Sequence, residues 1–407
     1  MNAINSGDVA WMLAATALVM FMTPGLALFY GGLVRTKNVL ATIMQSFILL
    51  GVVAILWVVF GYSIAFGTDQ GGFIGGLEYL GLAGVGLDPG PYSKTIPHIL
   101  FCAFQLMFAI ITPALITGAF AEHMKFSAYL AFTVLWTVLV YFPVCHWVWG
   151  GGWLGLGKLG ALDFAGGTVI HINSACAALV CAIVVGKRMG HGTDQLHPHN
   201  VPMSVLGAGI LWFGWFGFNA GSALAANGQA AMALFVTHIA AGTAAVTWVL
   251  AEWLYQGKPT TLGAASGAVA GLVAITPAAG FVGPMAAIAI GGVAGVICYF
   301  AIVAKSKLGY DDALDVVAVH GVGGLWGALS TGLFACAAYG GVDGLFYGNP
   351  KQFGIQAIGA FSAIAYSTVL SIIIIKVLDK TMGIRASQED EFSGMDLSQH
   401  SEVAYRT

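Results

Sequence analysis

The chain has 407 residues, of which 58% are hydrophobic and only 8% are charged, and its formal net charge is −3. An ordinary soluble domain carries roughly 25% charged residues, so this composition excludes a water-soluble fold of this length. The nearly balanced charge and the lack of a long basic cluster give no indication of nucleic-acid binding.

Apolar segments of about 20 residues recur along the whole chain, and they predict an all-α polytopic membrane protein. They are continuously apolar, whereas the strands of an outer-membrane barrel alternate. The first segment, about residues 9–34, lacks a basic leader and is therefore predicted to be a span rather than a cleaved signal peptide. Eleven spans are predicted, starting near residues 9, 39, 98, 126, 163, 201, 230, 262, 284, 314 and 353.

The Lys and Arg residues predict the direction of these spans, because short cytoplasmic loops carry an excess of positive charge. With the N-terminus outside, only Lys94, Lys158 and Lys351 lie on the outer side. The inner side then holds Arg35, Lys37, Lys125, Lys187, Arg188, Lys258, Lys305, Lys307, Lys376, Lys380, Arg385 and Arg406. This asymmetry predicts eleven spans with the N-terminus out and the C-terminus in. We therefore predict a transmembrane domain over residues 1–382 and a polar cytoplasmic tail over residues 383–407.

Small residues are patterned in two of the later spans. Gly263, Gly267 and Gly271 recur every fourth residue, as do Gly291 and Gly295. Small faces let helices approach closely in lipid, so the pattern favours a compact bundle, with lipid-compatible filler as the alternative. The six cysteines form no CxxC pair and are predicted to be buried small hydrophobes.

The same pair of polar residues opens the fifth and the tenth predicted spans. Asp163 precedes His171 by eight residues, and Asp312 precedes His320 by eight. Five spans separate the two copies, and an odd number reverses orientation, so the chain is predicted to contain two inverted five-helix repeats plus an eleventh helix. Each histidine then lies roughly 12 Å below its own aspartate, since a helix rises about 1.5 Å per residue. Both histidines are expected near the midplane.

Histidines inside a membrane usually line a pathway or form a buried pair, and a hydrogen bond that joins two helices is the structural alternative. His238 is also deep within a span, but it has no partner at the repeat spacing. A membrane enzyme that uses His171 and His320 as metal ligands lacks a third ligand at a recognisable spacing. The sequence therefore predicts no metal site, no cofactor and no enzyme.

Aromatic and hydroxyl residues near the outer ends of three spans fit a site for a small cation. Aromatic faces attract cations, and a hydroxyl accepts a hydrogen bond from an N–H donor. Taken singly, each aromatic residue is equally typical of an interface anchor or an ordinary span. The residues are Phe104 and Phe108 in FCAFQLMFAI, Trp149 in CHWVWGGGW, and Phe218 and Ser222 in FGWFGFNAGSA.

Several segments together resemble the ammonium transporters of the Amt/Mep type, which are related to the Rh proteins, in their prokaryotic Amt form. The resemblance runs from the first span to the tail. It implies a multi-pass protein of the plasma or inner membrane, in contact with lipid, that forms a homotrimer with one pore in each subunit. The segments are DFAGGTVIHINSACAAL, GWFGFNAGSA, ITPAAGFV, VHGVGGLWG and GIRASQEDEFSGMDLSQHSEVAY.

The resemblance also implies roles for residues on the outer side of the pore. Trp149, Ser222 and Phe108, with Phe104 beside them, look like the site that recruits ammonium. Asp163 matches a buried carboxylate that supports this site, and the same residue is suited to accept the free backbone N–H groups at a helix start.

Deeper in the pore, the resemblance makes Phe108 and Phe218 the stacked pair that closes it. His171 and His320 look like the twin histidines that line the lumen and relay protons. Asp312 looks like a mainly structural counterpart of the first aspartate. Ammonium would bind outside, lose its proton and cross as ammonia, and the sequence leaves open whether the transport is electrogenic or electroneutral.

The tail resembles an ordered family tail that connects neighbouring subunits, although its acidic run is equally typical of a disordered end. The resemblance further implies a soluble PII-type signal protein that binds at the cytoplasmic face. Two other functions remain open, an ammonium sensor that signals through a cytoplasmic partner and an Rh-like gas channel. Trp149 and Ser222 argue against the gas channel, since they match the Amt-type recruitment site.

Overall fold

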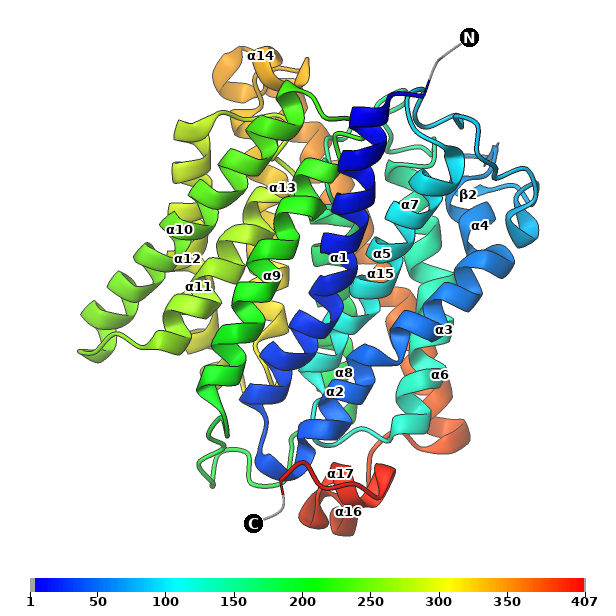
Figure 1. Cartoon of the computed structure of the whole chain (residues 1–407). Helices are drawn as coiled ribbons and strands as arrows, with labels where there is room; N and C mark the ends of the chain where they lie inside the picture. The colour runs from blue at the N-terminus through cyan, green and yellow to red at the C-terminus, as the bar shows by residue number, and fades with distance from the viewer. Residues whose placement is uncertain (1–3, 406–407) are drawn as a thin grey trace.

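The fold is a bundle of long helices, described here for residues 4–405 of a computed structural model (Figure 1). Long apolar segments become helices because every backbone polar group is then paired within its own segment. The longer helices are α1 (Ser6–Leu33), α2 (Val39–Phe47), α3 (Leu49–Leu56), α5 (His98–Ile116), α6 (Phe126–Trp136), α8 (Asn173–Val185), α9 (Val201–Gly221), α10 (Gly228–Gln256), α11 (Thr261–Ile275), α12 (Pro284–Leu308), α13 (Gly323–Phe334) and α15 (Pro350–Met382).

Short elements extend or connect these helices. They are α4 (Tyr62–Phe66), β1 (Asp69–Gln70), β2 (Ile74–Gly75), α7 (Phe142–Val148), α14 (Ala337–Gly340), α16 (Gln388–Ser393) and α17 (Met395–His400). Four segments of the described chain are π-helical: Trp57–Gly61, Thr137–Tyr141, Gly167–Ile172 and Val317–Val322. The last two each carry one of the histidines of the predicted pair.

Ten helical segments within residues 4–405 are long and apolar enough to cross a membrane. The prediction of a helical polytopic fold is therefore confirmed. The predicted span near residue 262 corresponds to α11, which has only 15 residues. At about 1.5 Å per residue it is shorter than a hydrocarbon core of roughly 30 Å, so it does not reach the length of a full span.

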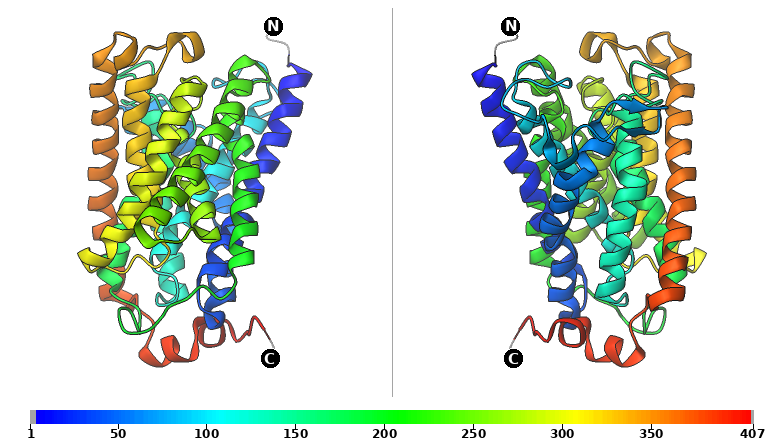
Figure 2. Two further views of the ribbon diagram at one scale, coloured as in Figure 1. Left: turned by 90° about the vertical axis from the view of Figure 1, so that its left-hand side faces the viewer. Right: turned by 90° about the vertical axis from the view of Figure 1, so that its right-hand side faces the viewer.

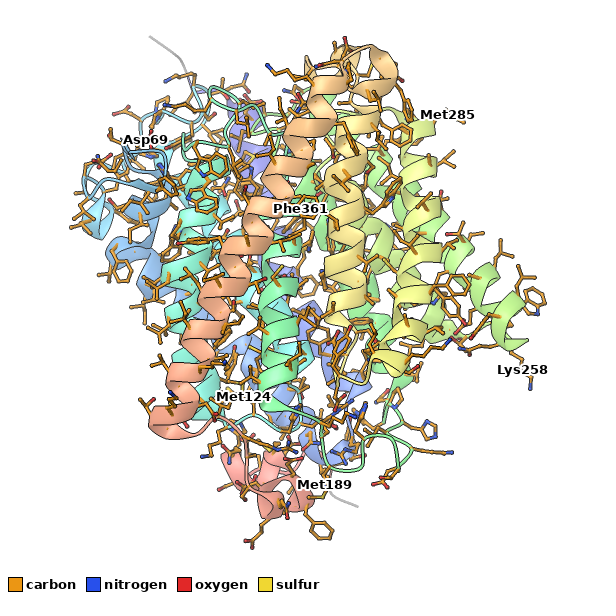
Figure 3. The ribbon with its side chains drawn as sticks, turned by 180° about the vertical axis from the view of Figure 1, so that it is seen from behind. Asp69, Met124, Met189, Lys258, Met285 and Phe361 are labelled. Carbon is orange, nitrogen blue, oxygen red and sulfur yellow. The ribbon has the colours of Figure 1, made fainter. Side chains whose placement is uncertain are left out.

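The helices run between two ends of the bundle, and Figure 2 shows the same ends in two side views. We call the end where α1 begins the upper end and the end that holds α16 and α17 the lower end. The β1–β2 hairpin and α14 lie at the upper end (Figure 1). From behind, α15, labelled at Phe361, spans the height of the bundle, and Met124 and Met189 lie close to the tail helices (Figure 3).

Glycine faces allow the closest helix contacts. Helix α10 packs against both α11 and α12. Gly267 of α11 faces the carbonyl of Ala244, where an added Cβ would lie 2.9 Å from the oxygen, and Gly271 and Gly291 leave even less room against the carbonyl of Ala240. The every-fourth-residue pattern therefore marks a helix contact, as predicted.

The tail is folded against the lower end. The Asp396 carboxylate accepts the backbone N–H groups of Leu40 at 3.0 Å and Ala41 at 2.8 Å, and so caps the first turn of α2. Lys37 donates to the main-chain carbonyls of Glu391 and Phe392. The acidic run thus lies in an ordered segment rather than a disordered one.

Candidate functional site

The two histidines of the repeated motif meet in the middle of the bundle. Nδ1 of His171 lies 3.1 Å from Nδ1 of His320, and the rings are nearly parallel with centroids 5.2 Å apart. Both side chains are buried. Two nitrogens at this distance share one hydrogen bond, so one ring donates while the other accepts. Nε2 of His171 is buried without a partner among the described residues.

Asp163 is held by the backbone at the start of the segment that carries His171. Its two oxygens accept the N–H groups of residues 166 to 169 at distances between 2.7 and 3.1 Å. The helix itself begins at Gly167, four residues later than the span predicted from residue 163. Between the aspartate and the helix, Gly166 adopts a φ of 120°, a backbone conformation that favours glycine.

Asp312 stands in the corresponding place before His320, but its contacts differ. Its carboxylate accepts the N–H of Val317 at 2.8 Å, and its main-chain carbonyl accepts Nζ of Lys305 at 2.6 Å. The Lys305 ammonium also pairs with Asp315 at 2.5 Å. The two aspartates therefore share a capping position, although the second is tied to a lysine.

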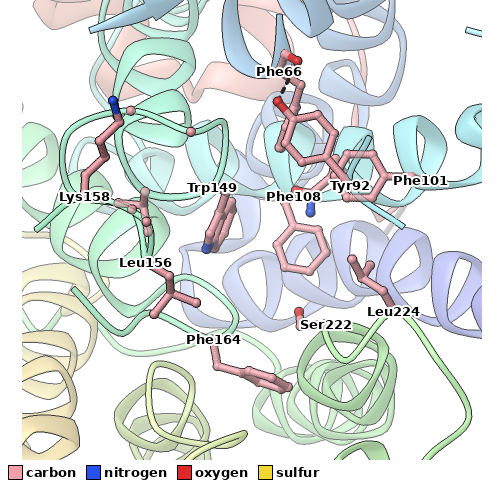
Figure 4. A pocket seen from close by; sticks show the side chains of 16 residues that line it. Phe66, Tyr92, Phe101, Phe108, Trp149, Leu156, Lys158, Phe164, Ser222 and Leu224 are labelled. Carbon is pink, nitrogen blue, oxygen red and sulfur yellow. Dashed lines mark hydrogen bonds between the residues drawn. The ribbon is translucent and has the colours of Figure 1, made fainter. Parts of the chain in front are cut away.

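A cavity of about 390 Å³ opens at the upper end (Figure 4). Phe108, Trp149 and Ser222, three of the residues predicted for the recruitment site, line it together. Trp149 donates its indole N–H to the carbonyl of Asp163 at 2.8 Å, which fixes the ring. Ser222 donates its hydroxyl proton to the carbonyl of Phe218 at 2.9 Å, so its oxygen remains free to accept.

A stacked pair of phenylalanines lies beside this upper cavity, and one of them, Phe108, lines it. The rings of Phe108 and Phe218 are stacked with centroids 4.3 Å apart, and both are buried. Phe104 lies behind them, tilted against Phe108 with centroids 4.8 Å apart. It is not among the residues that line the upper cavity, and it contacts Phe108, which does line it.

Two smaller hollows continue below the phenylalanine pair. The middle hollow, about 10 Å³, is lined by Phe218, His171 and His320 among mostly apolar residues, and it is about the size of one water. The lower hollow, about 60 Å³, is lined by His320 and Asp315. His320 thus lines both the middle and the lower hollow, and Phe218 of the middle hollow stacks on Phe108 of the upper cavity.

Comparison with known proteins identifies the family. The model of the Ammonium Transporter Family matches residues 10–405. The chain belongs to the ammonium transporter family. It is 52% identical over 403 residues to an ammonium transporter of Bacillus subtilis, covering 98% of each chain, and 48% identical over 403 residues to ammonium transporter Amt1 of Archaeoglobus fulgidus, covering 99% of this chain and 100% of the relative.

Solved structures agree with this ammonium transporter family assignment. The crystal structure of Saccharomyces cerevisiae Mep2 matches with a TM-score of 0.88 at 37% identity, covering 95% of this chain and 88% of the other. A structure titled "Sensor Amt Protein" matches with a TM-score of 0.89 at 29% identity, covering 97% and 98%. Together with its ten long apolar helices, the family assignment makes the chain a multi-pass membrane protein.

Sequence reasoning missed several residues that line the site of this family member. Phe164 and Gln105 line the upper cavity, and Trp215 stacks on His171 with centroids 5.5 Å apart. Phe164 follows Asp163 directly and Trp215 precedes Phe218 by three residues, so proximity to the predicted residues was an available signal. His238 lies within a span as expected, but its side chain is exposed beside Trp212, because depth along a helix does not specify which face points inward.

A buried ion network lies at the lower end of the ammonium transporter fold. The Glu122 carboxylate pairs with Arg35 and with Arg188, each at 3.1 Å, and Arg188 also pairs with Asp311 at 2.9 Å. Burial of Glu122 raises its pKa, but the two guanidinium groups outweigh this and hold the pKa below its usual value. Burial also opposes ionisation of Asp311, yet Arg188 lowers its pKa to about 2.

Proposed function

We propose that this chain transports ammonium across a membrane, recruiting the ion in the upper cavity and passing ammonia through the histidine-lined hollow. The names of its relatives support ammonium as the substrate. The observation that carries the proposed route is the His171–His320 pair, with Nδ1 atoms 3.1 Å apart, beneath the stacked Phe108–Phe218 pair.

Recruitment uses the groups that favour a cation. The faces of Trp149 and Phe108 attract ammonium through their quadrupoles, and the Ser222 oxygen accepts one of its N–H groups. Asp163 acts at a distance, because its oxygens are occupied by backbone N–H groups. Its charge favours a cation in the cavity without touching it.

Below the phenylalanine gate, a neutral molecule is the permeant species. A hollow of about 10 Å³ among apolar side chains leaves no room for a hydration shell, and a bare cation there carries a large desolvation cost. Ammonium therefore gives up its proton above the gate. The proton passes separately along His171 and His320, which share one N–H between facing nitrogens and thus exchange it readily.

The arrangement in the membrane follows from the same symmetry. We assign eleven spans, with α11 as a short eighth span, and two inverted five-helix repeats followed by α15. The upper end is then outside and the lower end is cytoplasmic. This assignment is supported by the two π-helical segments that carry His171 and His320, each preceded by a capping aspartate.

The assembly is a homotrimer in the plasma or inner membrane, with residues 1–382 as the transport domain in contact with lipid. Residues 383–407 form a cytoplasmic regulatory tail, and a PII-type signal protein binds at that face. Truncation after Gly383 should give an inserted trimer with reduced current or reduced inhibition by the PII-type protein. Full current together with unchanged inhibition would show that the tail is passive.

The test of transport is the current that follows an ammonium pulse on proteoliposomes. The wild-type protein should give ammonium-dependent current and none with sodium. His171→Leu combined with His320→Leu should abolish the current, whereas His238→Leu, on an exposed face, should retain it. Undiminished current in the double variant would reject the proton relay.

A sensor is the second candidate, favoured by the similarity to a structure titled "Sensor Amt Protein". A sensor would bind ammonium with little flux. Saturable ammonium binding by the purified protein, without current or ammonia flux in the same vesicles, would support the sensor over the transporter. Ammonia flux that survives Trp149→Ala with an unchanged concentration dependence would instead support the Rh-like gas channel.

A further inference from the structure

One buried histidine near the upper cavity has no role in the proposed route. His146 lies in the last turn of α7, three residues before Trp149, and its side chain is inaccessible to solvent. Nδ1 lies 3.0 Å from the carbonyl oxygen of Ala65, and Nε2 lies 3.2 Å from a carboxylate oxygen of Asp69. These partners belong to α4 and β1, so the ring joins three elements at the upper end.

The partners of this ring determine its charge. A carbonyl oxygen and an ionised carboxylate oxygen both accept hydrogen bonds and cannot donate them. A neutral imidazole has one donor nitrogen and one acceptor nitrogen, so it satisfies only one of the two contacts. The imidazolium form satisfies both. The hydrogen bond from His146 also lowers the pKa of Asp69, which lies outside the spans and remains ionised.

The charged surroundings favour the same form. Asp69 and Glu78, in the loop that follows α4, both interact with His146, whereas Lys158 is the nearby cation, 3.8 Å from the second oxygen of Asp69. Two carboxylates against one ammonium leave the surroundings negative, which stabilises a cationic ring. The neutral titratable groups on the neighbouring elements are Tyr62, Tyr92 and Cys145.

The loop that carries Trp149 packs against His146. The main-chain carbonyl of His146 accepts the N–H groups of Gly150 at 3.0 Å and Gly152 at 2.9 Å. A Cβ added to Gly150 would lie 2.5 Å from Nδ1 of His146 and closer still to the carbonyl of Ala65. The backbone beside Trp149 therefore rests directly on the contact between the ring and α4.

We propose that His146 is a positioning residue, an imidazolium bonded to Ala65 and Asp69 that fixes the backbone of Trp149 and thereby sets the affinity for external ammonium. This inference rests on the proposed recruitment role of Trp149. Substitution of Asp69 removes one of the two anchors, and substitution of the ring removes both. The loop then loosens, and ammonium binds more weakly while the pore itself is unchanged.

Transport measurements on proteoliposomes test the effect on affinity. His146→Gln and Asp69→Asn should raise the half-saturating ammonium concentration about two- to five-fold, as for a partly lost cation–π contact, with maximal current within about two-fold. Asp88→Asn removes an exposed carboxylate from the same outer loop and should behave as wild type.

Nitrogen NMR of ¹⁵N-histidine-labelled protein tests the charge without any transport. The His146 signal, assigned by its loss in His146→Gln, should show two protonated ring nitrogens near neutral pH.

Two outcomes would overturn the proposal. One is a ring nitrogen without a proton near neutral pH, because both contacts of the ring are to acceptor oxygens. The other is unchanged half-saturation in both His146→Gln and Asp69→Asn while Trp149→Ala raises it. If Trp149→Ala also leaves half-saturation unchanged, the recruitment role itself is wrong, and the NMR result still decides the charge of His146.

Discussion

Asp163 illustrates how a single side chain is fixed by the backbone alone. Four N–H groups share its two oxygens, so no lone pair remains for a bound ion. Its contribution to recruitment is therefore its charge and the position of its carbonyl, which holds the Trp149 indole at 2.8 Å. Asp163 therefore has a structural role, through its hydrogen bonds, and an electrostatic role, through its charge.

Removal of the Asp163 carboxylate should damage both stability and transport. Asp163→Ala leaves four buried N–H groups without a partner, at about 1 to 3 kcal/mol for each group that water cannot reach, and should abolish the current. Asp312→Ala should cost less, because its carboxylate accepts fewer backbone N–H groups. Thermal unfolding in detergent and ammonium pulses measure the two effects. Normal unfolding and normal current in Asp163→Ala would contradict both roles.

Substitution of the recruiting side chains should change affinity more than capacity. Trp149→Ala should raise the half-saturating ammonium concentration about two- to thirty-fold, which corresponds to a cation–π contact of roughly 0.5 to 2 kcal/mol, and Ser222→Ala should act in the same direction. Trp253→Ala, at an exposed position in α10, is the control. Identical concentration curves for all four proteins would remove both residues from the site.

At the scale of elements, the glycine faces decide how closely the helices approach. Gly271→Leu should separate α11 from α10 and cost about 1 to 3 kcal/mol or more, because the carbonyl of Ala240 leaves no room for a Cβ. Gly354→Leu in α15 has open space and should unfold within a degree or two of wild type. The melting temperatures of the two variants, measured in the same detergent, test the comparison.

The tail contributes to the start of α2. Asp396→Ala removes the acceptor for the N–H groups of Leu40 and Ala41 and should lower stability by about 1 kcal/mol, the usual cost of a lost helix cap. Glu389→Ala, at an exposed position in α16, is the matched change within the tail. Equal hydrogen exchange at the start of α2 in both variants would show that the cap is not needed there.

For the whole molecule, the ion network at the lower end ties together loops that are distant in sequence. Glu122, Arg188 and Asp311 each come from a different connection between helices. The pKa of Asp311 is depressed to about 2, so its contribution to stability is present above the usual carboxyl range near pH 4 and is lost as the pH falls towards 2.

Asp311→Asn should therefore lower stability at neutral pH by on the order of 2 kcal/mol, since one pKa unit corresponds to about 1.4 kcal/mol. Its melting temperature should converge with that of the wild type between about pH 4 and pH 2. Asp194→Asn, in the loop between α8 and α9, should show no such dependence. A gap between the wild type and Asp311→Asn that persists at low pH would exclude Asp311 as its source.

The sequence predicted the helical bundle because each span is a local apolar run whose length alone is informative. It also singled out His171 and His320, because each follows an aspartate by eight residues and this repeat can be read directly from the sequence. It did not predict the ion network, because Glu122 and Arg188 are 66 residues apart and ordinary loop charges look the same. It did not specify which of Phe104 and Phe108 lines the upper cavity, since sequence spacing does not resolve the direction of neighbouring rings.

The two π-helical segments have a consequence for how this chain can vary. A π turn holds one residue more than an α turn, so deletion of one residue from Gly167–Ile172 or Val317–Val322 would restore regular winding. Every side chain beyond the deletion would rotate by about 100° relative to those before it. Whether the two imidazoles meet thus depends on the number of residues in each π-helical segment. In a homologue, a one-residue gap in either segment would separate the two imidazoles as surely as the loss of a histidine.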